Sequence, residues 1–189
     1  MDQKRWDEKY KGKGFALGAE ANPFLRRSIR LLPRGKALDL AAGEGRNAVF
    51  LASRGFEVEA VDISREGLRK ARRLAKAQGV RIKTTAADLD HHRIPKESYD
   101  LIIDFYFLDR RLIPRMKRGL KRGGRIAFET YLAEARSMGL EGPANPKYLL
   151  KPNELLRFFH DFRILFYREG IFREGGKKKA VASLIAEKY

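Results

Sequence analysis

The 189-residue chain contains no cysteine. Disulfide bonds, thiolate metal ligands and cysteine nucleophiles are therefore excluded. Histidine is also scarce, and the spacing of its three copies, His91, His92 and His160, does not match a shared metal site. We expect no metal centre. We expect His91 and His92 to be exposed to solvent, because they lie in a polar loop.

Long apolar stretches are missing as well. No run approaches the roughly 20 residues that a transmembrane helix needs, so we expect no contact with a membrane. The first residues, Met1 to Asp7, lack the apolar core of a secretory signal, and we expect a cytoplasmic protein. A hydrophobic content of 43% and the chain length fit a single globular domain over residues 1–189.

Acidic residues are outnumbered, with 24 Asp and Glu against 41 Lys and Arg and a net charge of +17. A basic surface can attract nucleic acid or an anionic substrate, or can simply keep a protein dissolved. The basic stretches at 65–81 and 110–125 are predicted to lie on helices that cover opposite faces of a sheet. Such an arrangement disperses the charge, so nucleic-acid binding is possible but not favoured.

The most informative stretch is Ala37 to Asp62. An apolar run leads into the turn Gly43-Glu44-Gly45, and a helical pattern and a second apolar run follow, ending at Asp62. Strand, glycine loop, helix, strand and acid together form half of a nucleotide-binding α/β fold. Ala48 replaces the third glycine of a dinucleotide fingerprint, and Glu44 places negative charge in the loop. Both features favour a nucleoside without phosphates over NAD.

Acids lie near the ends of three neighbouring predicted strands, two in this unit and one in the strand that follows it. Asp39 can accept from an ammonium group or anchor the loop, Asp62 can bind ribose hydroxyls, and Asp88 can accept from an adenine amino group. The structural alternatives are a capping role for Asp62 before Ser64 and a turn role for Asp88. Together the acids favour a cationic nucleoside such as S-adenosylmethionine.

The rest of the chain alternates strands with helices. A helix capped by Asn22 precedes five strands, which are predicted at 36–41, 56–61, 80–85, 99–105 and 125–130. The intervening helices are predicted at 45–53, 65–78 and 111–120, the last ending at Gly123-Gly124. A non-periodic segment at 131–151, a helix at 153–160 and a β-hairpin over 162–185 follow. This order predicts an α/β fold with a parallel, doubly wound sheet and an added antiparallel strand.

The run Asp39 to Asn47, with Asp62 ending the second strand, resembles the class I S-adenosylmethionine-dependent methyltransferases. It is most similar to the branch that holds tellurite-resistance and, more distantly, thiopurine methyltransferases. Three further stretches carry the resemblance, which runs from about Trp6 to the C-terminus: Trp6 to Tyr10, Asn22 to Leu25 and Leu150 to Leu155. Ala41 departs from the pattern, since the family usually has its first glycine there, and we expect a slight loop displacement.

The resemblance implies a seven-stranded Rossmann-like sheet of order 3-2-1-4-5-7-6 and S-adenosyl-L-methionine as cofactor. The cofactor-binding residues that it implies are Trp6, Tyr10, Asp39, Ala41, Gly43, Gly45, Arg46, Asn47, Asp62, Ile63, Asp88, Leu89 and Asp104. Residues 1–21 would form a mobile cover over the cofactor, and residues 131–151 a lid over the methyl acceptor.

Methyl transfer from a sulfonium needs alignment and exclusion of water more than a base. Asp104 is the first candidate for a base, with a structural role as the alternative; Tyr106, Tyr131 and Tyr148 are others. The Asn/Asp-Pro-Pro-aromatic signature of amino-group methylation on nucleobases is absent after the fourth strand. Its absence argues against amino methylation of nucleobases but not against ribose or phenolic acceptors. With the resemblance, we expect a small-molecule acceptor of thiol, chalcogen oxyanion or phenol type, with RNA as the alternative, and a monomer or homodimer.

Overall fold

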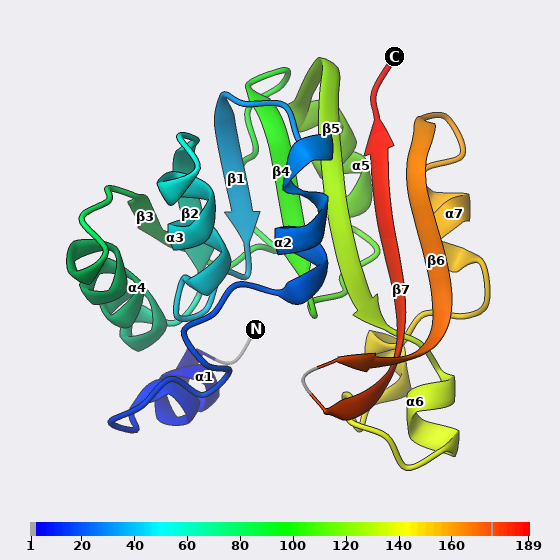
Figure 1. Cartoon of the computed structure of the whole chain (residues 1–189), viewed down its shortest axis with the longest axis horizontal. Coiled ribbons are helices and arrows are strands. Elements are labelled where there is room, and N and C mark those ends of the chain that lie inside the picture. Colours follow the sequence, from blue (N-terminus) through cyan, green and yellow to red (C-terminus); the bar gives the residue numbers. More distant parts are fainter. Residues whose placement is uncertain (1–2, 175) are drawn as a thin grey trace.

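The computed structural model describes residues 3–174 and 176–189 and is built around one seven-stranded sheet (Figure 1). The strands are β1 Lys36–Leu40, β2 Glu57–Asp62, β3 Lys83–Ala86, β4 Tyr99–Phe105, β5 Leu120–Tyr131, β6 Arg163–Glu174 and β7 Lys177–Glu187. Their spatial order is β3-β2-β1-β4-β5-β7-β6, which confirms the predicted order. The first five strands run parallel, and β7 is antiparallel to both β5 and β6.

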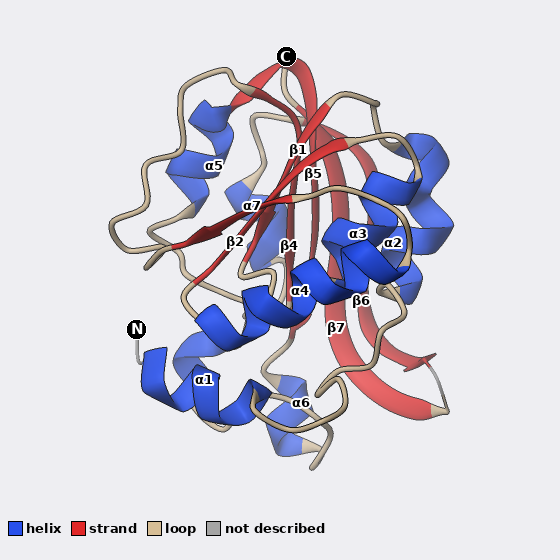
Figure 2. Cartoon of the chain, turned by 90° about the vertical axis from the view of Figure 1, so that its left-hand side faces the viewer, coloured by secondary structure: helices blue, strands red, loops and turns tan. Residues whose placement is uncertain are grey.

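Helices cover both faces of the sheet (Figure 2). One face packs on α2 Pro23–Ser28, the 3₁₀ turn η1 Ile29–Leu31, α3 Arg46–Ser53 and α4 Arg65–Ala77. The other face packs on α5 Ile113–Gly119 and α7 Glu154–Phe158. The side chains of Asn22 and Ser64 cap α2 and α4, as the sequence predicts. Because both faces are covered, β4 is buried along nearly its whole length, with the apolar run Leu101 to Ile103 at its centre.

The remaining helices gather at the carboxyl edge of the parallel strands, at the bottom of Figure 1. Helix α1 Gln3–Tyr10 lies there beside α4, and α6 Glu134–Ser137 lies beside β7. The short turn η2 Pro146–Tyr148 belongs to the same predicted lid segment, 131–151. The lid segment is thus not structureless, because two short helical turns and a bridge from Leu132 to Leu150 shape it.

The predicted boundary between the fifth helix and β5 is wrong. Helix α5 already ends at Gly119, and β5 begins at Leu120, so Gly123 and Gly124 lie within the strand. Gly123 adopts a φ of 74°, and the register against β4 shifts near Tyr99. The two glycines therefore serve an irregular strand start and do not end a helix.

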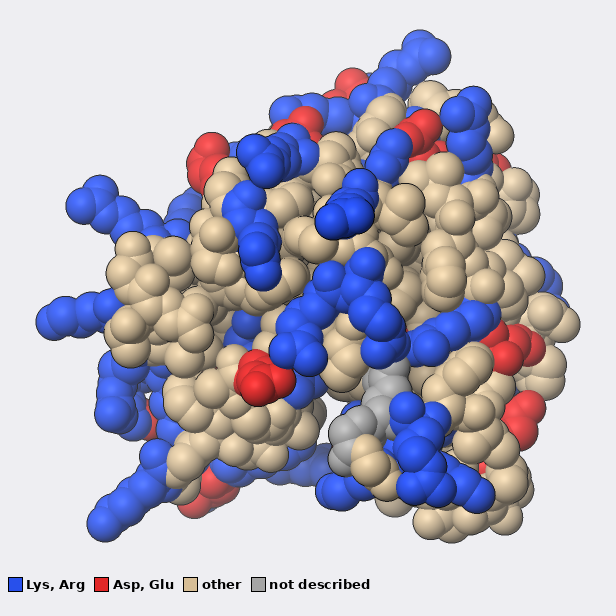
Figure 3. Space-filling view, viewed as in Figure 1, with Lys and Arg blue, Asp and Glu red and all other residues tan. Residues whose placement is uncertain are grey.

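The basic stretches lie on opposite faces, because α4 packs with α3 whereas α5 packs into the other core. Lys and Arg side chains are spread over the face drawn in Figure 3, with a few Asp and Glu side chains among them. Within the described ranges, no helix is long and apolar enough to cross a membrane.

Candidate functional site

A cleft opens at the carboxyl edge, between the N-terminal segment, the loop after β1 and the end of β4. Its walls include Tyr10, Leu17, Gly18, Asp39, residues 41–44, Arg46, Asn47, Phe105 and Tyr106. Ligands of open α/β sheets bind at this edge, where the strand order reverses on either side of β1 and β4. Six of the thirteen residues that the resemblance implies line this cleft: Tyr10, Asp39, Ala41, Gly43, Arg46 and Asn47.

The loop after β1 follows a left-handed backbone path. Ala41, Gly43 and Gly45 have φ values of 53°, 54° and 78°. Ala41 carries a side chain in a conformation that favours glycine, so the departure at this position is a source of strain. A Cβ on Gly45 would lie 2.4 Å from the Cβ of Ala71, and one on Gly43 would lie 2.8 Å from the Tyr10 hydroxyl. The loop thus needs both glycines for close packing.

Two buried acids lie at the ends of β1 and β4. Asp39 is 2% exposed and Asp104 is 1% exposed, and each has one carboxyl oxygen without a hydrogen-bond partner in the described structure. Burial raises the pKa of Asp39 to about 8, with the Asp62 charge adding to the effect. Burial, and then the nearby Asp39, raises the pKa of Asp104 well above its usual value. Asp39 lines the cleft, whereas Asp104 is not among the lining residues.

Asp62 is held by the backbone. One of its carboxyl oxygens accepts from the N–H of Gly43 at 2.7 Å, and the other from the N–H of Ser64 at 2.7 Å. These contacts match the structural alternative for Asp62, and they fix the glycine loop to the start of α4. Burial raises the pKa of Asp62 although both amides act against it. Ile63, the next residue, is half-buried.

Glu44 lies at the cleft, but its charge is paired, which the sequence interpretation did not include. Its carboxylate is 5% exposed and pairs with the buried ammonium of Lys70 at 2.8 Å. It also accepts from the N–H of Ala16, while Lys70 donates to the carbonyl of Gly14. The charge of Glu44 is therefore no reason to exclude a ligand with phosphates, and that part of the sequence interpretation is wrong. The ion pair instead ties the N-terminal segment to α4.

The predicted cofactor cover is docked on the site at two further points. Asp7 accepts from the Ser64 hydroxyl at 2.6 Å and from the N–H of Glu66 at 3.1 Å, so it occupies the amino end of α4. Tyr10 is 4% exposed and stacks on Trp6 with ring centroids 5.8 Å apart. Its hydroxyl lies against Gly43. Both predicted aromatics thus belong to the edge where the cleft opens.

The remaining predicted residues differ in what they contact. Arg46 lines the cleft and donates to the carbonyl of Leu17. Asn47 also lines it, but its side-chain oxygen accepts from the N–H of Asn22 at 2.9 Å. Asn47 therefore links helix α3 to the cap of α2.

Asp88 and Leu89 follow β3. Asp88 is half-buried, and its carboxylate accepts from the N–H of Asp90, which is the predicted turn contact. Leu89 is 2% exposed and packs in the core shared with α5. His91 is exposed, but the prediction for His92 is wrong, because it is half-buried and its Nε2 has no partner in the described structure. Burial lowers the pKa of His92.

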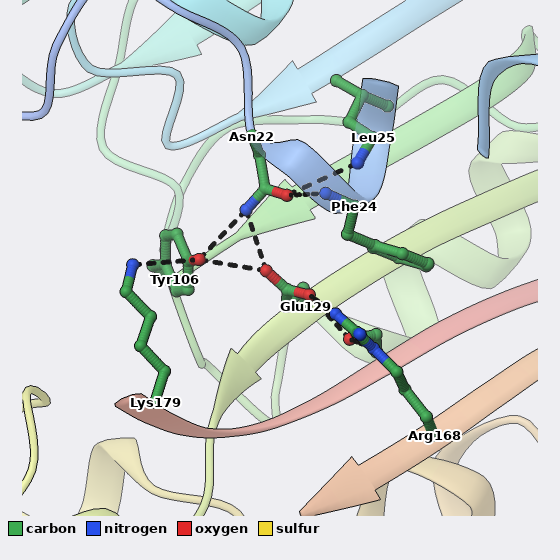
Figure 4. A network of polar contacts seen from close by, with 8 residues as sticks. Asn22, Phe24, Leu25, Tyr106, Glu129, Arg168 and Lys179 are labelled. Atoms are coloured by element: carbon green, nitrogen blue, oxygen red, sulfur yellow. Dashed lines mark hydrogen bonds and ion pairs between the residues drawn. The ribbon is translucent and has the colours of Figure 1, made fainter. Parts of the chain in front are cut away.

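Sequence reasoning missed a polar network beside the cleft (Figure 4). Glu129 of β5 is fully buried and accepts from the side chains of Asn22, Tyr106, Ser183 and Arg168. A charged residue directly after the apolar run 126–128 is the one sequence signal that could have found it. Among the described residues, no group of three or more acids and histidines could hold a metal ion.

Tyr106 connects this network to the cleft. Its ring lines the cleft wall and stacks on Tyr131, with ring centroids 4.9 Å apart. Lys179 of β7 lies over the Tyr106 ring, 4.7 Å from the centroid. The cleft lining therefore includes the buried acid Asp39 and also Tyr106, which carries Tyr131 and Lys179 against its ring.

The sequence also matches known proteins. The family model described as tellurite resistance protein TehB matches residues 6–180. A probable S-adenosyl-L-methionine-dependent methyltransferase TehB of Haemophilus influenzae is 26% identical over 148 residues, which cover 76% of this chain and 51% of that protein. Hemagglutinin 1 of Eikenella corrodens is 25% identical over 151 residues, which cover 78% of this chain and 50% of that protein. The chain spans about half the length of these relatives.

Solved structures share the fold. The crystal structure of TehB from Haemophilus influenzae has a TM-score of 0.76 at 21% identity, covering 99% of this chain and 67% of that one. A SAM-dependent methyltransferase from Methanosarcina mazei has a TM-score of 0.70 at 19% identity, covering 89% and 98%. Because the family model matches nearly the whole sequence, the chain belongs to the tellurite resistance protein TehB family.

Proposed function

We propose that the protein transfers a methyl group from S-adenosyl-L-methionine to a small-molecule acceptor in the cleft. The observation that carries the proposal is the buried oxygen of Asp39, which lines the cleft without a partner. A cationic ammonium group would satisfy it. The related proteins named as S-adenosyl-L-methionine-dependent methyltransferases support the same cofactor.

The residues present fit this cofactor. Asp39 would hold its ammonium, Asp62 its ribose hydroxyls, and Ile63 and Leu89 its adenine. Gly43 and Gly45 let the backbone approach, and Trp6 and Tyr10 would cover it. When bound, the cofactor supplies a methyl group on a sulfonium, already activated for transfer.

The chain's own part in the reaction is to align the acceptor and exclude water. The bond from methyl carbon to sulfur breaks as the bond from carbon to the acceptor atom forms. We assign Asp104 no proton-abstracting step, because its side chain is 1% exposed and is not among the residues that line the cleft. An acceptor that arrives as an anion needs no base, and the cations Arg46 and Lys179 suit a thiolate, phenolate or chalcogen oxyanion.

RNA is the second candidate acceptor, since the surface is strongly basic. The dispersal of α4 and α5 over opposite faces gives it less support than a small acceptor has. The segment 131–151 would close over the acceptor, with Met138 and Tyr148 as its exposed apolar side chains.

The test uses cofactor labelled on the methyl group. We expect calorimetry to give micromolar binding, and we expect label to pass to selenite, a thiophenol or a phenol. No heat and no thermal shift at millimolar cofactor would overturn the proposal. Label that passes only to RNA, with a salt-dependent gel shift, would replace the small acceptor by nucleic acid.

A further inference from the structure

Glu129 is a buried carboxylate whose hydrogen-bonding capacity is filled by side chains. One oxygen accepts from Asn22 Nδ2 at 2.8 Å and from the Tyr106 hydroxyl at 3.0 Å. The other accepts from the Ser183 hydroxyl at 2.6 Å and lies 3.4 Å from Arg168 Nη2. Each of these partners is a donor, which is the environment of an ionised carboxylate.

Strand register places the charged members of this network side by side. Glu129 pairs with Ser183 across β5 and β7, and Arg168 pairs with the same Ser183 across β6 and β7. Residues that lie directly opposite in antiparallel strands share one face of the sheet. On that face, the neighbours toward the centre of the sheet, Ala127 and Ile185, are apolar and fully buried. The polar cluster thus ends an otherwise apolar surface at the carboxyl edge.

Stability alone does not account for a charge here. Replacing a buried ion pair by packed apolar residues is often neutral or stabilising, so the pair is weak evidence of a role in folding. What this carboxylate does is hold Tyr106 in place. It accepts from the Tyr106 hydroxyl, and the carbonyl of the same glutamate accepts from the Tyr106 N–H at 2.8 Å.

Tyr106 needs such a hold because its backbone is strained. Its φ of 63° lies in the left-handed region, which is unfavourable for a bulky residue. The hydroxyl also accepts from Asn22 at 3.1 Å and faces Lys179 at 3.4 Å. Since its proton points to Glu129 and its lone pairs face donors, the hydroxyl is not placed to act as a base. Tyr106 instead offers a fixed wall that also sets the position of Lys179.

We propose that Glu129 is a positioning residue for the acceptor side of the reaction, acting through Tyr106 and Lys179. The inference rests on the proposed methyl transfer in this cleft. Its consequence is selective, because Glu129 bonds to neither Asp39 nor Asp62 in the hydrogen bonds described above. Its link to Asn47, which the resemblance implies for the cofactor, is indirect and runs through the backbone N–H of Asn22. Loss of the Glu129 charge should therefore impair use of the acceptor and spare binding of the cofactor.

Glu59 provides a matched control elsewhere in the sheet. It is 6% exposed and accepts from the Tyr99 hydroxyl at 3.1 Å and the Thr85 hydroxyl at 3.0 Å, with Lys83 as its cation. It therefore repeats the chemistry of the Glu129 network away from the residues that line the cleft. A merely structural role predicts the same behaviour for Glu59→Gln and Glu129→Gln.

The experiment measures cofactor affinity by calorimetry and methylation of selenite and 4-methylbenzenethiol with labelled cofactor. For Glu129→Gln we expect kcat/KM for the acceptor to fall about tenfold to a hundredfold, while the cofactor Kd changes by less than about twofold. Tyr106→Phe, which removes one oxygen, should cause a similar loss, and the double variant should be no worse than Glu129→Gln alone. Glu59→Gln should leave kcat/KM unchanged.

Equal losses in Glu59→Gln and Glu129→Gln, or additive losses in the double variant, would overturn the inference. If the parent protein binds cofactor but methylates neither probe, the acceptor part of the proposed function fails, and NMR of ¹³C-tyrosine-labelled protein still tests Glu129. We then expect the Tyr106 ring signals to shift in Glu129→Gln and not in Glu59→Gln. Unshifted Tyr106 signals would overturn the positioning role.

Discussion

Asp39 and Glu129 are both buried carboxyl groups near the carboxyl ends of parallel strands, but their surroundings differ. Glu129 has donors on both oxygens, whereas Asp39 has one oxygen with no partner in the described structure. A buried polar group without a partner carries a free-energy cost that a ligand can remove. The proposed cofactor side is thus incomplete by itself, whereas the carboxylate of the proposed acceptor side has partners on both oxygens.

The largest effect is expected from Asp62→Ala, which changes the proposed cofactor side and should lower the affinity for the cofactor. Asp62 would lose its contacts to the ribose hydroxyls and its hold on Gly43, so cofactor affinity should fall about a hundredfold. Calorimetry measures this directly. Asp100→Ala is the control, because Asp100 also accepts from a backbone N–H and pairs with Lys121, but at the opposite end of the sheet. Unchanged affinity in Asp62→Ala would remove the cofactor side from this cleft.

Asp39→Asn tests whether the open carboxyl destabilises the protein. The pKa of Asp39 is raised from 3.8 to about 8 in the folded state, so folding retains a proton that the unfolded chain releases. The resulting cost to stability grows as pH rises from about 4 to about 8 and then stays constant. The variant without cofactor should therefore gain about 1 to 2 kcal/mol at pH 8, or roughly 3 to 6 °C in Tm, and less at pH 5.

Thermal denaturation of parent and Asp39→Asn at both pH values checks this prediction. The same variant should bind the cofactor about tenfold more weakly, since a neutral amide replaces a carboxylate beside an ammonium. An identical Tm difference at pH 5 and pH 8 would contradict the role of the raised pKa.

Ser183→Ala tests whether Glu129 needs all of its hydrogen-bond donors. It removes the shortest hydrogen bond to Glu129 and leaves a buried oxygen with fewer donors, so the free energy of unfolding should fall by about 1 to 2 kcal/mol. Urea denaturation provides the measurement. Ser137→Ala serves as control, because the Ser137 hydroxyl bonds to Glu134 on the exposed surface. Equal effects of the two substitutions would mean that Glu129 does not depend on its full set of donors.

Ala41→Gly should have the smallest effect. The φ of 53° at Ala41 is strained for alanine, but glycine also increases the freedom of the unfolded chain. We expect a net gain of about 0.5 kcal/mol and cofactor affinity within about twofold of the parent. Ala42→Gly, at a residue without a positive φ, should instead lose stability. A lower Tm for Ala41→Gly would show that the loop is not strained at this position.

The two sides also differ in how far the sequence could predict them. The cofactor side depends on the contiguous run from Ala37 to Asp62, where strand, glycine turn, helix and acid follow one another. Its contacts stay within this unit and its immediate continuation, spanning 2 residues from Asp62 to Ser64 and 19 from Asp62 to Gly43. The sheet order came from resemblance, and the structure confirms it.

The acceptor side could not be predicted in this way. Glu129 meets Asn22 from 107 residues away and Ser183 from 54 residues away. Only the register of β5, β7 and β6 brings these partners together, and no local pattern encodes that register. The interpretation of Glu44 was wrong for the same reason. Its partner Lys70, which neutralises its charge, lies 26 residues further along the chain on α4.

The position of β7 has a consequence for synthesis of the chain. Strand β7 leaves the ribosome after both of its neighbours, β5 and β6, yet it lies between them. Until it arrives, the nascent sheet ends at an open β5 edge, and the Glu129 charge lacks its partner from β7. Open strand edges recruit other chains. The Glu129 network is therefore completed only after β7 has been made, and the β5 edge is open to pairing with other chains until then.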